Sequence, residues 1–431
     1  MRGTEFQKHP IIAARLLFFM LFLVNMSTIS AYQNTNQTLI EYKGKIIDSE
    51  KRKPLIFADI SVPTTKISTI SNKEGKFSIK IPERLGISTL SISFLGYETT
   101  VVNLSQLEQK INIIVLHPTV TELAQISINA PKDARALVKL ALKNRGEKYI
   151  KTEATMTAFY RETIKKRKKN ASLTEAVVKI YKQPYHTSRR DEIELVKSRK
   201  NTNYSRLDTI ALKLQGGPFS ALFSDIVKYP DYIFTKESFD FYDFSFNTST
   251  EINDRNVYVV NFKQQENSMV PLYKGNLYID AETFAIISAD YELNIENKAE
   301  ATKLFLKKKP RNVDVETVTA QYKVDYKLSN NKWHYSYSNL QLAFRVKWAK
   351  KLFSKTYTLD VEMAVTDWDN NLFEKINSER KIKPSIILSD EASGFSDLKF
   401  WGKFNIIEPE KSIESAIRKI SKQLTKIDKN D

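Results

Sequence analysis

Seven short β-rich runs follow one another between residues 41 and 116, and this rhythm is the strongest constraint that the sequence places on the fold. The runs are 42–47, 58–62, 68–71, 76–81, 89–94, 100–104 and 111–116. Seven strands at a spacing of about 8 to 12 residues are typical of a β-sandwich. The turn at residues 72–75 ends in Gly75, and Phe77 and Ile79 then alternate toward one face.

The first 31 residues have the pattern of an export signal. Arg2, Lys8 and Arg15 precede an apolar run at residues 16–24, and small or polar residues follow as far as Ala31. The run is too short to span a bilayer, which needs about 20 apolar residues. We therefore expect a signal peptide at residues 1–31 and an exported protein, in the periplasm or at the outer-membrane periphery.

The chain has 431 residues, no cysteine and a formal net charge of +17. Disulfides and thiolate sites are therefore excluded. The excess charge either solubilises loops or meets an anionic surface, and export disfavours nucleic acid as the partner. Two basic blocks are the candidate contacts to an anionic envelope surface. They are formed by Lys165, Lys166, Arg167, Lys168 and Lys169, and by Lys307, Lys308 and Lys309.

A set of short motifs in the first region, which follow one another in a fixed order, carries a family resemblance. The motifs are residues 44–48 (GKIID), 53–55 (KPL), 58–60 (ADI), 71–77 (SNKEGKF), 90–94 (LSISF) and 96–98 (GYE). In this order they resemble the carboxypeptidase-regulatory-like, or transthyretin-like, β-sandwich that is abundant in exported proteins of the Bacteroidetes. Asn72 stands where that family usually has Asp, and both residues favour a turn.

The resemblance implies no peptidase activity, because the module accompanies the catalytic domain of metallocarboxypeptidases and has no zinc ligands itself. A zinc site would need a His/Glu/His set with metal-ligand spacing. His117, His186 and His334 are the histidines after residue 31, and none belongs to such a set. We expect no metal, no cofactor and no catalytic residue.

The rest of the chain reads as a helix followed by a large antiparallel sheet. An amphipathic helix opens at Pro131 and closes at Gly146. The expected strands are 175–182, 256–262, 275–280, 285–293, 319–328, 333–346 and 356–368. Short polar turns between long strands favour antiparallel pairing. The Gly216-Gly217-Pro218 sequence predicts a turn beside a short helix, and a last helix is expected from Pro409, packed on the sheet or lying on a membrane surface.

Several segments after residue 130 resemble the uncharacterised C-terminal region often found behind this sandwich. They are residues 158–162, 175–181, 275–280, 400–402 and 405–410. At the level of architecture the order of elements is similar to periplasmic lipoprotein-carrier half-barrels. The predicted fold is mainly β: a seven-stranded sandwich at residues 41–116, a linker at 117–132, and an α+β domain at 133–431 with a large curved antiparallel sheet and flanking helices.

Two sets of residues could carry chemistry. Glu162 and Glu175 could act as paired carboxylates in glycoside hydrolysis, and Arg161 could pair with Glu162 as a buried ion pair. Six aromatic side chains could stack on sugars, although sheet core is the more common role. They are Trp333, Tyr335, Tyr337, Trp348, Trp368 and Trp401. No nucleophile and base stand out together, so a hydrolase is the least favoured function.

The sequence thus favours a non-enzymatic binding protein of the cell envelope, in which a half-barrel-like sheet holds an apolar or lipidic ligand or a partner peptide. The alternative is a structural docking module for an outer-membrane protein. A lipid carrier needs a continuous apolar cavity, whereas a docking module needs a filled core. The expected partners are an outer-membrane protein or an acyl ligand, with peripheral membrane contact.

Overall fold

The computed structural model describes most of the chain after the predicted signal peptide. The described residues are 38–108, 110–119, 132–167, 169–202, 215–266, 270–305, 311–369, 376–394 and 400–415. Of the described residues, those between 41 and 81 and between 87 and 415 belong to one compact unit, and residues 38–40 and 82–86 belong to the other. The predicted signal peptide and most of the predicted linker lie outside the described residues.

The first strands form the predicted sandwich, and each of the seven expected strands is confirmed. They are β1 (Leu39–Asp48), β2 (Asp59–Ser61), β3 (Ser68–Ile70), β4 (Lys76–Pro82), β5 (Thr89–Ser93), β6 (Thr100–Asn103) and β7 (Asn112–Leu116). One sheet has the order β4-β1-β7 and the other β3-β2-β5-β6. The short 3-10 helices η1 (Glu83–Leu85) and η2 (Leu104–Gln106) stand in the connections.

The turn between β3 and β4 has the geometry that its sequence predicts. The side-chain oxygen of Asn72 accepts hydrogen bonds from the backbone N–H groups of Glu74 at 2.8 Å and Lys76 at 3.0 Å. Gly75 has a φ of 76°, and an added Cβ would lie 2.6 Å from the carbonyl oxygen of Ile46. Glycine is therefore required here for both its backbone angle and its small size.

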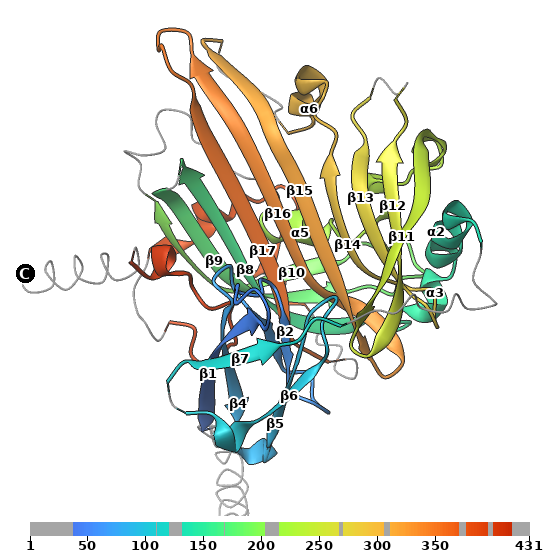
Figure 1. The fold of residues 1–431 in the computed structure, drawn as a ribbon. Helices are drawn as coiled ribbons and strands as arrows, with labels where there is room; N and C mark the ends of the chain where they lie inside the picture. Colours follow the sequence, from blue (N-terminus) through green and yellow to red (C-terminus); the bar gives the residue numbers. More distant parts are fainter. Residues whose placement is uncertain are drawn as a thin grey trace, which may run out of the picture. The chain divides into compact units, whose positions relative to one another are not determined.

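A third sheet, larger than the two of the sandwich, is built from long strands that mostly pair with their neighbours in the sequence (Figure 1). Its order is β11-β12-β13-β14-β15-β16-β17-β8-β9-β10-β18, with β19 beside β10. The strands are β8 (Ala154–Lys166), β9 (Lys169–Lys182), β10 (Glu192–Thr202), β11 (Tyr242–Ile252), β12 (Arg255–Gln264), β13 (Tyr273–Asp280), β14 (Ile286–Leu293), β15 (Val313–Ser329), β16 (Lys332–Trp348), β17 (Lys355–Asp369), β18 (Lys381–Ile382) and β19 (Ser393–Gly394).

All seven strands expected in this region are present, and the sequence analysis missed β8, β10, β11 and the two-residue strands β18 and β19. In β11 the alternation was visible, since Tyr242, Phe244 and Phe246 alternate with polar residues. All pairings in the sheet are antiparallel except that of β10 with β19.

The helices of this region are short. They are α2 (Ala134–Lys143), α3 (Arg145–Lys148), α5 (Pro218–Leu222), η3 (Pro230–Tyr232), η4 (Ser238–Phe241), α6 (Lys298–Phe305) and α7 (Leu388–Glu391). The expected end of the first helix at Gly146 is wrong, because α2 ends at Lys143 and Gly146 lies in α3. Gly146 instead allows close packing against His186, since a Cβ added at residue 146 would lie 2.8 Å from the Cβ of His186.

The predicted turn and short helix at residues 216–222 are confirmed by α5, with Gly217 at its N-terminal cap. Residues 411–415 are helical, and the remainder of the predicted C-terminal helix lies outside the described residues. Within the described ranges, no helix has the length and apolar character needed to cross a membrane.

One face of the large sheet, here called the inner face, carries the main core. It includes Tyr160, Val178 and Leu340, and side chains from α2, α5 and residues 226–239 pack in the same cluster. A second cluster continues along this face near α6 with Leu342 and Phe344. The chain's own helices and loops therefore cover the face that we expected to hold an apolar ligand.

Candidate functional site

Opposite the inner face, polar side chains form one row across nine strands. In an antiparallel sheet, residues directly opposite each other point to the same face. Eight successive pairings place the row in register. In order from β12 to β10 the row, here called the outer row, consists of Asn261, Asn276, Asp290, Lys323, Asn339, Glu362, Arg161, Glu175 and Arg199.

The last four residues of the outer row are buried and form a ladder of alternating charge, here called the covered half. Arg161 Nε lies 2.7 Å from Glu175 Oε1, and its Nη1 lies 2.9 Å from Glu362 Oε1. Arg199 Nη2 lies 2.7 Å from Glu175 Oε2. No member is more than 5% exposed. Such burial is tolerable only because each charge meets an opposite charge.

The two carboxyl groups of this ladder differ in their pKa. Burial opposes ionisation of Glu175, but Arg161 and Arg199 together hold its pKa below the ordinary value. Burial raises the pKa of Glu362 to about 7, and Arg161 alone among the ladder's cations opposes this change. Two guanidinium groups are thus needed to keep a carboxylate ionised at this depth.

Residues 400–408, here called the covering segment, lie over the covered half. Arg161 Nη2 donates a 2.7 Å hydrogen bond to the carbonyl oxygen of Ile407, and Lys197 Nζ donates one to the carbonyl oxygen of Phe400. The guanidinium of Arg199 lies 4.8 Å from the ring centroid of Trp401. The row therefore binds an irregular stretch of polypeptide through its backbone carbonyls and an aromatic ring.

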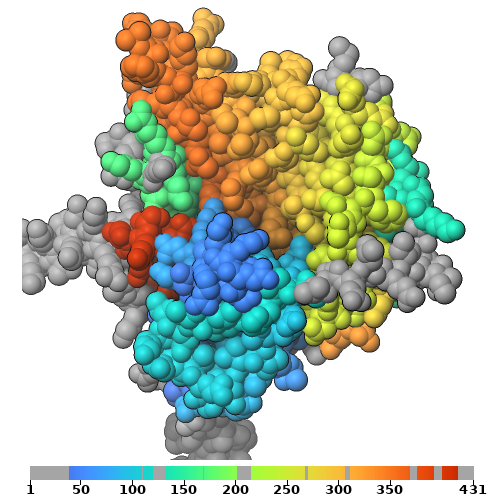
Figure 2. Space-filling model, viewed as in Figure 1, coloured from blue at the N-terminus to red at the C-terminus, as the bar shows by residue number. Residues whose placement is uncertain are grey.

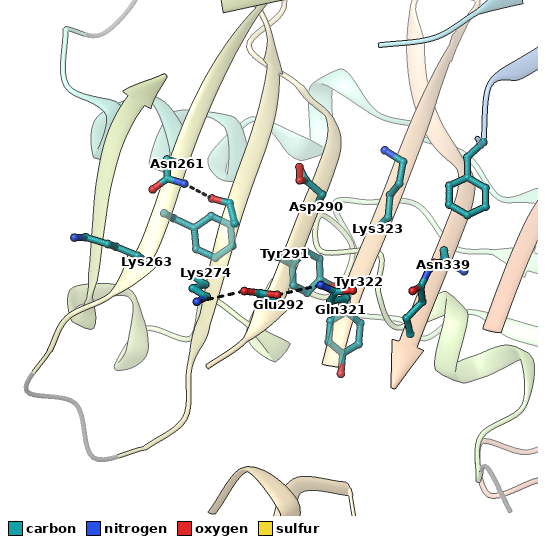
Figure 3. A pocket seen from close by; sticks show the side chains of 14 residues that line it. Asn261, Lys263, Lys274, Asp290, Tyr291, Glu292, Gln321, Tyr322, Lys323 and Asn339 are labelled. Carbon is teal, nitrogen blue, oxygen red and sulfur yellow. Dashed lines mark hydrogen bonds and ion pairs between the residues drawn. The ribbon is translucent and has the colours of Figure 1, made fainter. Parts of the chain in front are cut away.

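The first five residues of the outer row are here called the open half, and four of them line an open groove of about 570 Å³. Asn261, Asp290, Lys323 and Asn339 line it, together with a parallel row one step along the strands. In that second row Glu292 joins Lys274, at 3.3 Å, to Gln321, whose Nε2 donates to it at 3.2 Å (Figure 3).

The groove offers both hydrogen-bond donors and acceptors. Lys323 Nζ lies 3.0 Å from Asp325 and is a quarter exposed. Asp290 Oδ1 is buried and has no hydrogen-bond partner among the described residues, while the hydroxyl of Tyr278 bonds to the same carboxyl group. Gln341 Nε2 donates to Asn339 Oδ1 at 3.0 Å. An acceptor without a donor is costly when buried, so a bound partner that donates to Asp290 would relieve that cost.

The basic block at residues 165–169 lies at the β8–β9 turn. Lys165 lies 3.8 Å from Glu410, so this lysine has a carboxylate neighbour already. The backbone N–H of Arg167 bonds to the carbonyl oxygen of Thr356 at 3.0 Å, and Lys166 and Lys169 are opposite each other in the register. Lys168 and Lys307, Lys308 and Lys309 lie outside the described residues. The role of these residues stays a prediction.

The residues considered for hydrolysis do not form a site. Glu162 lies on the inner face, where Tyr160 donates to it at 3.1 Å, whereas Glu175 lies on the outer face. The paired-carboxylate hypothesis and the Arg161–Glu162 ion pair are therefore wrong, and the partners of Arg161 are Glu175 and Glu362. The described residues contain no group of three or more His, Cys, Asp or Glu that could hold a metal ion.

A second cluster of charged side chains is buried on the inner face, beneath the segments that cover it. Lys182 is fully buried, and its Nζ lies 2.6 Å from Asp191 and 2.7 Å from Asp225. Asp225 also accepts from the hydroxyls of Tyr185 at 2.8 Å and Tyr326 at 2.7 Å. Burial lowers the tendency of Lys182 to hold its proton, but the two aspartates keep its pKa raised. This cluster anchors the segments that fill the inner face.

The six aromatic candidates are at most 8% exposed, so they belong to the core. Sequence reasoning missed the outer row, although part of its signal was visible. Asp290 and Glu292, and likewise Asn339 and Gln341, stand two apart in strands whose intervening residues are apolar or aromatic. The alternation indicates a polar face, but only the register aligns these residues across strands.

Comparison with known proteins identifies the first region. Residues 42–128 match the CarboxypepD_reg-like domain family, which confirms the domain expected there. No curated protein matches the chain. The solved structures that match include the following two. One, from Vibrio parahaemolyticus, is described as an outer membrane lipoprotein-sorting protein domain and shares 12% identity over 56% of this chain and 94% of its own, at a TM-score of 0.26.

The other is a DUF1329 family protein from Desulfovibrio piger, with 8% identity over 57% of this chain and 96% of its own, at a TM-score of 0.23. Scores this low carry no argument about the fold or the function of this chain.

Proposed function

We propose that the protein is a non-catalytic binding protein of the cell envelope whose groove holds an extended segment of a partner protein. One observation carries this proposal. The covering segment is held where Arg161 of the outer row, on β8, and Lys197, on β10, donate to its carbonyl oxygens, and the outer row lines an open groove farther along the sheet. The open half is suited to the same kind of occupant.

The dimensions of the groove fit a short peptide. Neighbouring strands lie about 4.8 Å apart, so the open half spans roughly 19 Å across five strands, the length of about six extended residues. A peptide offers a donor and an acceptor at every residue. Lys323 and the amide of Gln321 could donate to its carbonyls, and Asp290 could accept from its N–H groups or from a basic side chain.

A polar lining favours a partner segment over an acyl chain. An acyl chain gains affinity from apolar surface that it buries, whereas nine of the 14 residues that line the groove carry amides or charges, beside the aromatic Phe57, Phe262, Tyr291 and Tyr322. The inner face, which is apolar, is covered by α2, α5 and residues 226–239. The proposal therefore joins two of the functions expected from the sequence, binding of a partner peptide and docking to an outer-membrane protein, and assigns both to the outer row. Export to the envelope rests on the predicted signal peptide.

The test is site-specific photo-crosslinking in the cells that make the protein. A benzophenone amino acid replaces Gln321 inside the groove or, as the control, Lys110 on the sandwich, whose side chain is 74% exposed. We expect a discrete adduct with one envelope protein from the Gln321 position and none from Lys110. Equal labelling from both positions, or no adduct at Gln321, would contradict the proposal.

A further inference from the structure

The turn between β16 and β17 presents two exposed apolar side chains side by side in the sequence. Leu352 is 91% exposed and Phe353 is 79% exposed, the highest values among the large apolar residues that the structure describes. The turn stands at one end of the large sheet, at the top of the view in Figure 1. In Figure 2 no other coloured part of the chain covers this orange turn. Isolated apolar residues are common on surfaces, but an adjacent pair at a projecting tip indicates a contact.

Cations surround this pair. Lys347, Lys350 and Lys351 are exposed, and Lys355 is half-buried. The ring of Trp348, at the end of β16, lies 5.2 Å from Lys351 Nζ and 5.6 Å from Lys355 Nζ. The turn therefore has apolar side chains at its tip and a belt of positive charge at its base.

The neighbouring turn adds more positive charge at the same end of the sheet. The hydrogen bond from Arg167 N–H to Thr356 O joins the β8–β9 turn to the start of β17. Lys166 lies opposite Tyr357 in the register. At the base of the β16–β17 turn, the acidic residue Asp314 lies opposite Lys347 in the register. The predicted basic block at 165–169 thus adjoins the β16–β17 turn.

The start of β15 also lies beside this turn. The backbone N–H of Ala349 bonds to the carbonyl oxygen of Asn312 at 3.0 Å, which holds the start of β15 against the turn. The helix α6, which precedes β15 in the chain, exposes 56% of Leu304. One end of the sheet therefore concentrates lysines, arginines and three exposed apolar side chains.

We infer that this end of the sheet docks on an anionic lipid surface, with Leu352 and Phe353 inserted at the level of the headgroups and the surrounding lysines against the phosphates. A surface of apolar tips and basic flanks matches the two layers of such an interface. This inference rests on different residues from the groove and does not depend on the proposed function.

The experiment is vesicle flotation of the mature chain. One set of vesicles contains phosphatidylglycerol and phosphatidylcholine, and the other contains phosphatidylcholine alone. We expect the protein to float with the anionic vesicles and much less with the neutral ones. Added salt should weaken binding, because it screens the lysine–phosphate attraction.

The double variant Leu352→Ser/Phe353→Ser tests the apolar tip. It should lower binding to anionic vesicles by more than tenfold, because two inserted side chains supply much of the affinity. The matched control, Val101→Ser/Ile113→Ser, removes two side chains that are each 64% exposed on the sandwich and should bind like the parent. The charge variant Lys350→Glu/Lys351→Glu should also weaken binding.

Several outcomes would overturn the inference. One is equal flotation with neutral and anionic vesicles, and another is a tip variant that binds like the parent. A third is a tip variant that converts a dimer into a monomer in sedimentation while the parent binds no vesicle, since this would make the turn an interface between copies. The unfolding midpoint of each variant, which we expect to be unchanged for side chains this exposed, checks the fold.

Discussion

The covered and open halves of the outer row use similar residues for different purposes. In the covered half, two arginines and two glutamates alternate and pair directly, and no residue is more than 5% exposed. In the open half, three amides flank one pair of opposite charges, Asp290 and Lys323, and both of these residues are half-buried. In the covered half, each charge is paired with an opposite charge, so the side chains can be buried. In the open half, amides stand beside the charges, so hydrogen-bond donors and acceptors remain free to bind a partner.

Loss of a charge from the covered half is the largest expected effect and would break the comparison directly. Glu175→Ala leaves Arg161 and Arg199 buried without the carboxylate that they share. We expect a loss of about 3 to 5 kcal/mol in the free energy of unfolding, measured by urea denaturation. The counterpart in the open half, Glu292→Ala, should cost less than about 1 kcal/mol. Equal losses would show that the two halves do not differ.

The buried carboxyl group of Glu162, which lies outside the outer row and forms no ion pair among the described residues, shows how a pKa changes when a buried carboxyl group is not paired with a cation. Burial raises the pKa of Glu162 to about 7 from the ordinary value of 4.5, and the hydrogen bond that Glu162 accepts from Tyr160 opposes this rise only in part. A raised acid pKa means that the folded state holds the proton more tightly. The stability that this proton contributes is therefore complete below about pH 4.5 and is lost as the pH rises through about 7.

The variant Glu162→Gln removes this dependence. Relative to the variant, the parent should lose on the order of 3 kcal/mol between about pH 5 and about pH 8, since one pKa unit corresponds to about 1.4 kcal/mol. Denaturation of both proteins across this range provides the measurement. Parallel curves would show that Glu162 is ionised without cost at its buried position.

The sandwich contributes a smaller contact to the outer face. Lys73, in the predicted turn, forms an ion pair with Asp360, and both side chains are at most 25% exposed. We expect Lys73→Ala to reduce the free energy of unfolding by about 1 kcal/mol, since a partly buried pair lies between the surface and buried cases. A double-mutant cycle with Asp360→Asn isolates the pair. A coupling energy near zero would contradict a contribution from this ion pair.

The smallest effect on stability belongs to the open half. Gln341→Ala removes an amide that lines the groove, and we expect a change within about 0.5 kcal/mol. Crosslinking from the Gln321 position should nevertheless fall severalfold in this variant. A large loss of stability would place Gln341 with the structural residues of the covered half instead.

The sequence predicts the sandwich well and the outer row poorly, for physical reasons. The strands of the sandwich are short and separated by turns such as residues 72–75, whose chemistry is local. The outer row depends on how nine strands align, and a shift of one residue would move each side chain to the other face. Arg161 shows the consequence: its chain neighbour Glu162 points away from it, and its partners come from strands 14 and 201 residues distant.

The most direct test of the central claim is a charge swap within the open half. Asp290 and Lys323 are directly opposite in the register, so Asp290→Lys/Lys323→Asp preserves the net charge and the opposition of signs while reversing their places in the groove. The measurement is the yield of the Gln321 crosslink together with the unfolding midpoint. We predict that the adduct with the envelope partner disappears and the midpoint stays close to that of the parent. An adduct of undiminished yield in a stably folded swap variant would contradict recognition by the open half.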